Sequence, residues 1–212
     1  MGYAGDYGGD YAKGVTAAAE ANGLTVAWEY IVPSPEFDVA QAVGLMVTKP
    51  VDAYFPAVGP THMAQVAGGA FQQGLTPLSM MAAPSFNDAF VREGFALAPL
   101  FTSGSMYLMA FVAPYEAETA GHATMRATFS AMGIDSANTF LVAGWASQHH
   151  LKGVLEAANK GGDLTRAGIR RAAGSVYVDS DGMMPQRELG QNRADAESFI
   201  AVPDGTIASG VK

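Results

Sequence analysis

The first hundred residues alternate between two hydrophobic patterns, one typical of strands and one typical of helices. Short apolar runs rich in β-forming residues predict strands at residues 24–32, 51–58, 76–83 and 95–101. Between them, apolar residues recur at helical spacing, at residues 10–22, 34–50, 61–74 and 85–94. Strands of low charge that alternate with helices predict an α/β fold with a parallel sheet and helices on both faces.

The second half of the chain is dominated by helical patterns. Residues 106–133 are predicted to be largely helical, and residues 137–162 form one long helical pattern. A short helix follows at 163–174, with an acidic start and a basic end that suit the helix dipole. The remaining residues, 175–210, carry strand signals and turns. The sequence therefore predicts a helical region appended to the α/β part.

The chain opens on MGYAGDYGGDYAKG, a glycine-rich turn that leads into a helical pattern. Such a turn normally leaves the end of a parallel strand, yet only four residues precede Gly5. We therefore expect that strand to be absent and its neighbour to have an unpaired edge, which is a route to association. The glycine spacing fits neither GxGxxG nor GxxxxGK[ST], and Asp6 and Asp10 would repel phosphate, so a phosphate site is not expected.

Composition indicates a sizeable core and excludes some classes of partner and site. Hydrophobic residues make up 49% of the 212 residues and charged residues 15%, which argues against disorder. The net charge is −8 and no run of Lys or Arg occurs, whereas nucleic-acid binding needs a basic face. Without cysteine there is no disulfide, thiolate metal site or cysteine nucleophile. We expect no nucleic-acid partner, no cofactor and no metal.

One uncharged stretch, residues 94–115, is about as long as a membrane span. Proline, serine, threonine and glycine lie at its centre, so the sequence predicts a strand followed by a buried helix. Six methionines are most simply core residues, namely Met46, Met63, Met80, Met81, Met106 and Met109. The first residues lack the basic start and apolar run of a signal peptide, which on its own predicts a cytoplasmic chain.

A series of short segments resembles the branched-chain amino-acid type of periplasmic solute-binding protein, which has a type I two-lobed fold. DYGGDYAKG opens a helix, GLTV leads into a strand, PEFD precedes a helix, and KPVDA and FQQGLTP precede strands. Later, AGW starts a long helix that ends in EAANKGGDLT, and DSDGMMP and LGQN lead to a strand with a PDG turn. These segments follow one another over almost the whole chain.

The resemblance implies a lobe organisation and a transport role. It covers the C-terminal portion of such proteins, so the chain looks like a truncated piece. We expect an α/β ligand-binding lobe at residues 1–120, a helical region at 121–175 that normally packs on the missing lobe, and C-terminal strands at 176–212 that return to the sheet. The implied partners are a small-molecule ligand and the membrane subunits of an ABC importer, in a periplasmic or extracellular setting.

In the resembled family, ligand sits against loops at the carboxyl ends of the strands, as in other open α/β sheets. The first such loop contains Tyr7, where relatives often place an aromatic ring; packing on the helix start is the alternative role for this side chain. The other two loops supply the remaining candidates, at Gly59, Pro60 and Thr61 and at Ala82, Ala83 and Pro84.

The loop at residues 82–84 lacks the acid that amino-acid binders commonly place there for the ligand ammonium. A buried ammonium without a counter-charge is costly to desolvate. We therefore expect a neutral or aromatic solute rather than a standard branched-chain amino acid.

A small promiscuous hydrolase is the alternative hypothesis, with Ser103, Ser105 and His149 as the residues that would have to meet in space. No G-x-S-x-G motif supports it. His149 and His150 are adjacent, so on a helix they point about 100° apart and cannot share a metal as an i, i+4 pair would.

The segment DSDGMMPQRE, residues 179–188, partly matches the calcium-binding loop of an EF-hand. Asp179, Asp181, Gly182 and Glu188 would take positions 3, 5, 6 and 12 of that loop, and Tyr177 would take position 1. Tyrosine is no calcium ligand of that type, so a β-turn at Asp181-Gly182 is the prediction.

The unpaired strand edge and apolar residues around Trp145 predict association. Large exposed apolar patches are uncommon on monomers. We expect a homodimer whose interface involves the helices after Asp135.

Overall fold

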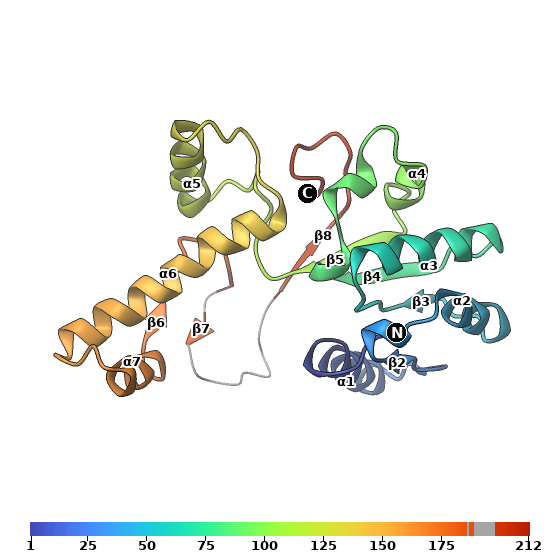
Figure 1. The fold of residues 1–212 in the computed structure, drawn as a ribbon, viewed down its shortest axis with the longest axis horizontal. Helices are drawn as coiled ribbons and strands as arrows, with labels where there is room; N and C mark the ends of the chain where they lie inside the picture. The colour runs from blue at the N-terminus through green and yellow to red at the C-terminus, as the bar shows by residue number, and fades with distance from the viewer. Residues whose placement is uncertain (186, 189–197) are drawn as a thin grey trace. The chain divides into compact units, whose positions relative to one another are not determined.

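The computed structural model describes residues 1–185, 187–188 and 198–212 (Figure 1). The chain folds into two compact units, residues 1–109 with 200–211 (unit 1) and residues 110–199 with Lys212 (unit 2). Residues 110–120 therefore group with the helices that follow them. The LGQN segment of the sequence resemblance, at 189–192, lies outside the described residues.

In unit 1, a short strand does precede Gly5. β1 (Gly2–Tyr3) pairs in parallel with β2 (Ile31–Val32), and Gly2 also bridges Ala57. The Tyr3 amide donates to the Ala57 carbonyl at 3.0 Å, and the Ala57 amide donates to the Met1 carbonyl at 2.9 Å. The expectation of a missing strand is wrong, because residues 1–4 have backbone partners on both sides.

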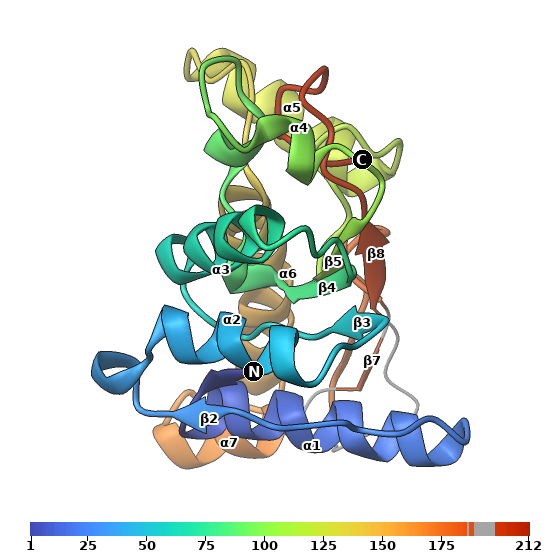
Figure 2. The ribbon, with the colours of Figure 1, turned by 90° about the vertical axis from the view of Figure 1, so that its right-hand side faces the viewer.

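The other strands of unit 1 form a sheet of order β3-β4-β5-β8 (Figure 2). The pairs β3–β4 and β4–β5 are parallel, and Ser79 of β4 is in register with Met106 of β5. The strands are β3 (Ala53–Tyr54), β4 (Leu78–Ala82), β5 (Met106–Ala110) and β8 (Phe199–Ala201).

The uncharged stretch 94–115 is arranged in the reverse order to the prediction, with a helix before a strand. Residues 95–101, predicted as a strand, contain the short helix α4 (Ala98–Phe101), and Pro99 lies in its first turn. Gly104 then turns the chain with φ of 86°, and the strand is β5. Proline favours the first helical turn because its φ is already helical. Among the described residues, no helix is long and apolar enough to cross a membrane.

Three helices of unit 1 correspond to the predicted ones, α1 (Asp6–Ala21), α2 (Val39–Thr48) and α3 (Pro60–Gln72). α2 and α3 pack side by side. β1 lies between β2 and the segment that follows β3, because Gly2 bridges Ala57. Three short 3₁₀ turns complete the unit, at Ser34–Glu36, Ala83–Ser85 and Asp88–Val91.

The core of unit 1 is made of methionine, valine and aromatic side chains. Among its fully buried large residues are Met46, Met63, Met81, Phe101 and Leu108. The prediction that the methionines fill the core fails at one of them, Met109, which is 36% exposed.

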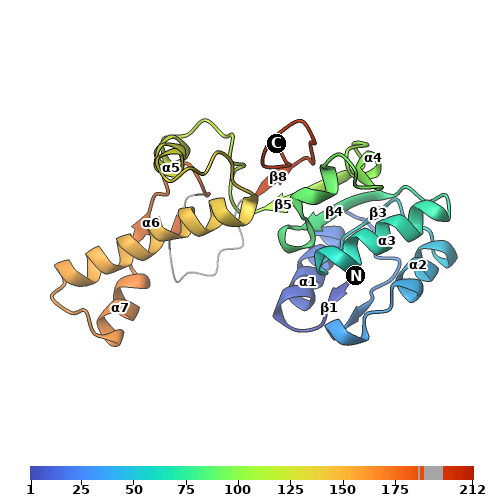
Figure 3. The same cartoon turned by 45° about the horizontal axis from the view of Figure 1, so that its top comes forward.

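Unit 2 is built on the long helix α6 (Thr139–Lys160), which matches the predicted 137–162. α7 (Arg166–Ala173) lies against the C-terminal part of α6 (Figure 3). α5 (Ala120–Ala131) and the antiparallel pair β6 (Tyr177–Val178) and β7 (Arg187–Glu188) complete it.

The main core of unit 2 surrounds α5 and the first half of α6. Val112, Met125, Val142 and Met183 are fully buried there, and Trp145 packs edge-on against Phe129 with ring centroids 5.5 Å apart. Trp145 is thus partly buried against this core.

Candidate functional site

The candidate site lies in unit 1, where the chain leaves β1, β3 and β4. These three strands run parallel, so their carboxyl ends share one edge of the sheet. The loop after β1 leads to Tyr7, the loop after β3 leads to Gly59, and the loop after β4 begins at Ala83. Ligands of open α/β sheets bind at this edge.

Ser85 joins the first loop to the other two. Its hydroxyl is fully buried, lies 2.8 Å from the Val58 carbonyl, and accepts a hydrogen bond from the Val58 amide at 3.1 Å. The Tyr7 hydroxyl lies 3.3 Å from the same oxygen. The structure thus brings Tyr7, the 58–59 segment and the 83–85 turn together.

The predicted site residues differ in how accessible they are. Tyr7 is half-buried in the first turn of α1, and Gly59 and Pro60, at the start of α3, are half-buried too. Thr61 and Pro84 are exposed, whereas Ala82 and Ala83 are buried. Ala82 and Ala83 therefore pack inside the protein. The accessible surface of the three loops includes Tyr7, Thr61 and Pro84.

An aromatic cluster that the sequence reasoning missed lies beside Gly59. The Tyr3 hydroxyl is 2.7 Å from Nδ1 of His62, and the His62 ring stacks on Phe37 at a centroid distance of 4.9 Å and 24°. Phe37 also meets Tyr3 edge-on at 5.8 Å. The available signal was position: Tyr3 ends β1, and His62 lies in the first turn after β3.

Two tyrosine hydroxyls on α1, those of Tyr7 and Tyr11, have raised pKa values. Burial raises the pKa of Tyr7, an effect that the hydrogen bond to Ser85 opposes in part. Burial likewise raises the pKa of Tyr11, whose hydroxyl donates to the Met80 carbonyl at 2.8 Å. Tyr7 therefore presents an uncharged hydrogen-bonding group to the site.

Charged side chains are scarce on the loops of this edge. The segments 3–7, 57–62 and 82–85 contain neither Lys nor Arg, and Asp6, which is exposed, is their one carboxylate. The nearby Asp38 carboxylate is engaged as the cap of α2, where it accepts from the amides of Ala40 at 2.8 Å and Gln41 at 3.2 Å.

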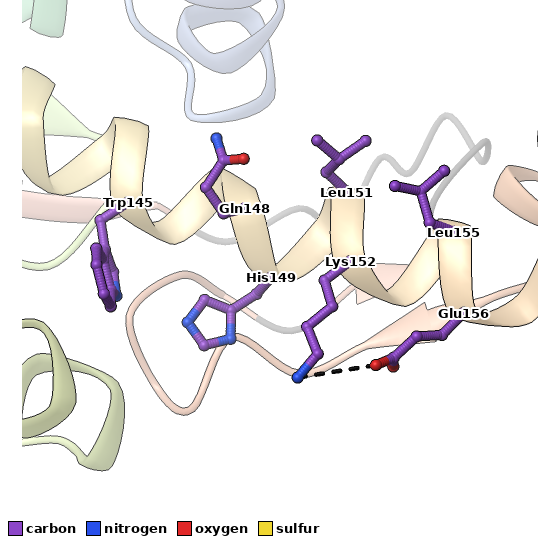
Figure 4. A pocket seen from close by; sticks show the side chains of 7 residues that line it. All are labelled: Trp145, Gln148, His149, Leu151, Lys152, Leu155 and Glu156. Carbon is purple, nitrogen blue, oxygen red and sulfur yellow. Dashed lines mark ion pairs between the residues drawn. The ribbon is translucent and has the colours of Figure 1, made fainter.

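A second hollow, of about 520 Å³, runs along α6 in unit 2 (Figure 4). Trp145, His149 and Lys152 project to one side of the helix, and Gln148, Leu151 and Leu155 to the other. Lys152 is paired with Glu156 at 3.8 Å. Its side chains converge on no common point, so we regard the strand-end site as the better candidate for a small ligand.

The other chemical candidates gain no support from the described residues. Ser103 and Ser105 hydrogen-bond to each other at 2.7 Å, and Ser103 also donates to the Leu100 carbonyl. No cluster of three or more His, Asp or Glu that could hold a metal occurs in the part of the chain that the structure describes.

The predicted turn at Asp181-Gly182 is confirmed by φ values of 52° and 81°. The side chain of Glu188, the last of the calcium-loop candidates, lies outside the described residues.

A model of the periplasmic binding protein family matches residues 1–205. The chain belongs to this family. Among solved structures, the periplasmic binding fold recurs in a fatty acid ABC transporter substrate-binding protein from Thermomonospora curvata, at TM-score 0.84 and 24% identity over 100% of this chain and 55% of that chain. An ABC transporter substrate-binding protein from Aeropyrum pernix gives TM-score 0.70 and 16% identity, over 100% and 57%.

A third structural relative bears on the ligand question. It is a branched-chain amino acid ABC transporter protein from Thermus thermophilus with bound valine, at TM-score 0.65 and 12% identity, over 100% of this chain and 58% of that chain. The chain thus spans 55–58% of the length of these three proteins. No curated protein matches it. The family model confirms the predicted family, and the solved structures confirm the α/β type I fold.

Proposed function

We propose that this periplasmic binding protein chain binds a small neutral or aromatic solute at the carboxyl ends of β1, β3 and β4. The observation that carries the proposal is the convergence of Tyr7, Ser85 and the Tyr3–His62 pair on this edge, on loops without Lys or Arg. Aromatic rings with a few convergent polar groups are typical of small-molecule sites.

The ligand class follows from what the loops lack. Residues 59–61 and 82–84 contain no carboxylate, so an α-ammonium group has no counter-charge on these two loops. One structural relative is named for a fatty acid and another holds bound valine, so the fold does not choose between ligands. An uncharged solute fits the side chains of this chain better than leucine, isoleucine or valine does.

The transport role follows from the family. We propose that the bound solute is delivered to the membrane subunits of an ABC importer, in the periplasmic or extracellular setting of this family. The hydrolase alternative is not carried forward, because the serines that it needs are hydrogen-bonded to each other.

Isothermal calorimetry on the full chain tests the ligand class. We expect benzamide, an uncharged aromatic probe, to bind more tightly than leucine, isoleucine or valine. A dissociation constant of 1 μM corresponds to a binding free energy of about −8 kcal/mol. We expect weaker binding of an amino acid, because its ammonium group would have no counter-charge on these loops. Micromolar or tighter binding of a branched-chain amino acid would show that the proposed ligand class is wrong.

We also propose that the chain forms a homodimer through α6. Leu141, Leu151 and Leu155 are 43%, 52% and 38% exposed. With Gly144 and Gln148 they recur at spacings of three and four residues, which is the spacing of a helix–helix seam. The same stripe on a second copy is its natural complement under twofold symmetry.

A further inference from the structure

One nitrogen of the His62 ring has a hydrogen-bond partner, and the other has none among the described residues. Nδ1 lies 2.7 Å from the Tyr3 hydroxyl. Nε2 has no hydrogen bond among the described residues, and the buried unpaired polar atoms of those residues are Ser79 Oγ and Trp145 Nε1. His62 Nε2 therefore faces solvent at the strand-end edge. Its ring is held by stacking on Phe37, which is only 7% exposed.

Gly59 is part of the same arrangement. A Cβ atom at this position would lie 3.1 Å from the Tyr3 hydroxyl, tighter than ordinary contact. Glycine thus leaves room for the phenol to reach His62. This gives a physical reason for a residue that the sequence suggested as a ligand contact, and its role becomes one of positioning.

The hydrogen bond to Nδ1 sets the chemistry of Nε2. A neutral imidazole carries one ring proton, and the bond made by one nitrogen selects which nitrogen holds it. We propose that the Tyr3 hydroxyl donates to Nδ1 of His62, and that the open Nε2–H donates to the carbonyl oxygen of a neutral aromatic solute. This inference rests on the proposed function and names the ligand group that the site recognises.

The charge pattern favours a carbonyl over a carboxylate or an amine. A carboxylate taken from water needs a cation or several donors, and the loops at 3–7, 57–62 and 82–85 hold no Lys or Arg. Asp6, on the first of these loops, also repels an anion. The Nε2–H group of His62 is one donor beside the rings of Phe37 and Tyr3. A ligand that matches it has one uncharged carbonyl acceptor attached to an aromatic ring, as in an aromatic amide, ester or ketone.

Nitrogen-15 NMR of ring-labelled histidine in the full chain tests the tautomer. We expect the His62 signals, assigned by their loss in His62→Gln, to show Nε2 protonated and Nδ1 unprotonated. In Tyr3→Phe the phenol is gone while the ring remains, so the two tautomers should become mixed. A His62 with its proton on Nδ1 would overturn the proposal, as would an unchanged tautomer in Tyr3→Phe.

Calorimetry with benzamide, benzoate and benzylamine, which share one ring and differ in charge, tests the ligand group. We expect benzamide to bind best, and His62→Phe, which keeps a ring against Phe37, to weaken its binding about fivefold. His149→Phe, on α6, is the matched control and should leave affinity unchanged. Equal benzamide binding by wild type and His62→Phe would overturn the inference and leave solute binding intact. No binding of any aromatic or aliphatic solute would overturn both.

Discussion

Single side chains at the strand-end edge divide into those that hold the loops and those that face outward. Ser85 is fully buried and has hydrogen bonds to both backbone groups of Val58, so it fixes the loops. Tyr7 reaches this serine from α1 while remaining half-buried. Tyr7 therefore has both a structural contact and a surface that a solute can touch.

Substitution of Tyr7 separates these two roles. We expect Tyr7→Ala to weaken benzamide binding about tenfold, since an aromatic contact is lost. The melting temperature should change by only a few degrees, because Ser85 keeps its bonds to Val58. Tyr7→Phe, the matched control, retains the ring and should bind nearly as well as wild type. If Tyr7→Ala unfolds unit 1, this tyrosine is a packing residue and its assignment to the site fails.

The sequence predicted three loops that meet at this edge of the sheet, and it missed two of the residues that lie there. Tyr7, Gly59 and Ala83 were placed through the family resemblance, and all three lie at the predicted edge. Tyr3 and His62 are 59 residues apart and meet only because β1 and the end of β3 are neighbours. No local sequence pattern predicts that pairing. Because the first strand was expected to be absent, Tyr3 was not placed at the end of a strand.

His122 in unit 2 is a buried histidine with a structural role. It has no exposed surface, its Nε2–H donates to the Ala113 carbonyl at 3.3 Å, and Nδ1 lies 2.7 Å from the Thr119 hydroxyl. Burial lowers the pKa of His122 below its usual value of 6.5, and the nearby Arg126 lowers it further.

This lowered pKa makes the stability of unit 2 sensitive to acid. Below about pH 6.5 the unfolded chain binds a proton that the folded chain resists, so the free energy of unfolding falls as pH drops through that value. Trp145 is the one tryptophan of unit 2, so its fluorescence in a Trp28→Phe background reports unfolding of this unit. We expect His122→Gln to reduce the pH dependence between about pH 5 and 7. An identical slope in this variant would exclude His122 as the cause.

Helices were predictable from sequence because their ends carry local signals. Asp38 caps α2, Asn138 caps α6 and Thr165 caps α7, each through its side chain. Strands were less predictable, since β2 and β3 have only two residues each. The run 95–101 is apolar enough for a strand, but Pro99 and the turn at Gly104 fit a short helix followed by β5.

Two adjacent glycines of α1 give a matched test of how this helix packs on β1. A Cβ at Gly8 would lie 2.1 Å from the Tyr3 carbonyl oxygen, whereas a Cβ at Gly9 meets nothing within 4 Å. We expect Gly8→Ala to destabilise unit 1 by about 2–3 kcal/mol and Gly9→Ala to stabilise it by about 0.5–1 kcal/mol. Urea unfolding followed by Trp28 fluorescence in a Trp145→Phe background measures both. Equal effects of the two substitutions would refute the close approach of α1 to β1.

At the scale of the whole molecule, the exposed stripe on α6 predicts a concentration-dependent dimer. Leu151→Lys places a charge in the proposed seam and should give a monomer by light scattering at low micromolar concentration. Lys152→Glu, on the other side of the same helix (Figure 4), is the control and should remain dimeric. A folded wild-type monomer at these concentrations would contradict the proposed interface.

The central claim is that a neutral solute binds at the carboxyl ends of β1, β3 and β4. Amide NMR of the nitrogen-15-labelled full chain, titrated with benzamide, tests it most directly. The account predicts saturable shift changes concentrated at residues 3–7, 57–62 and 82–85, with little change along α6. Shift changes confined to the hollow lined by Trp145, Leu151 and Leu155, or no saturable change at all, would contradict it.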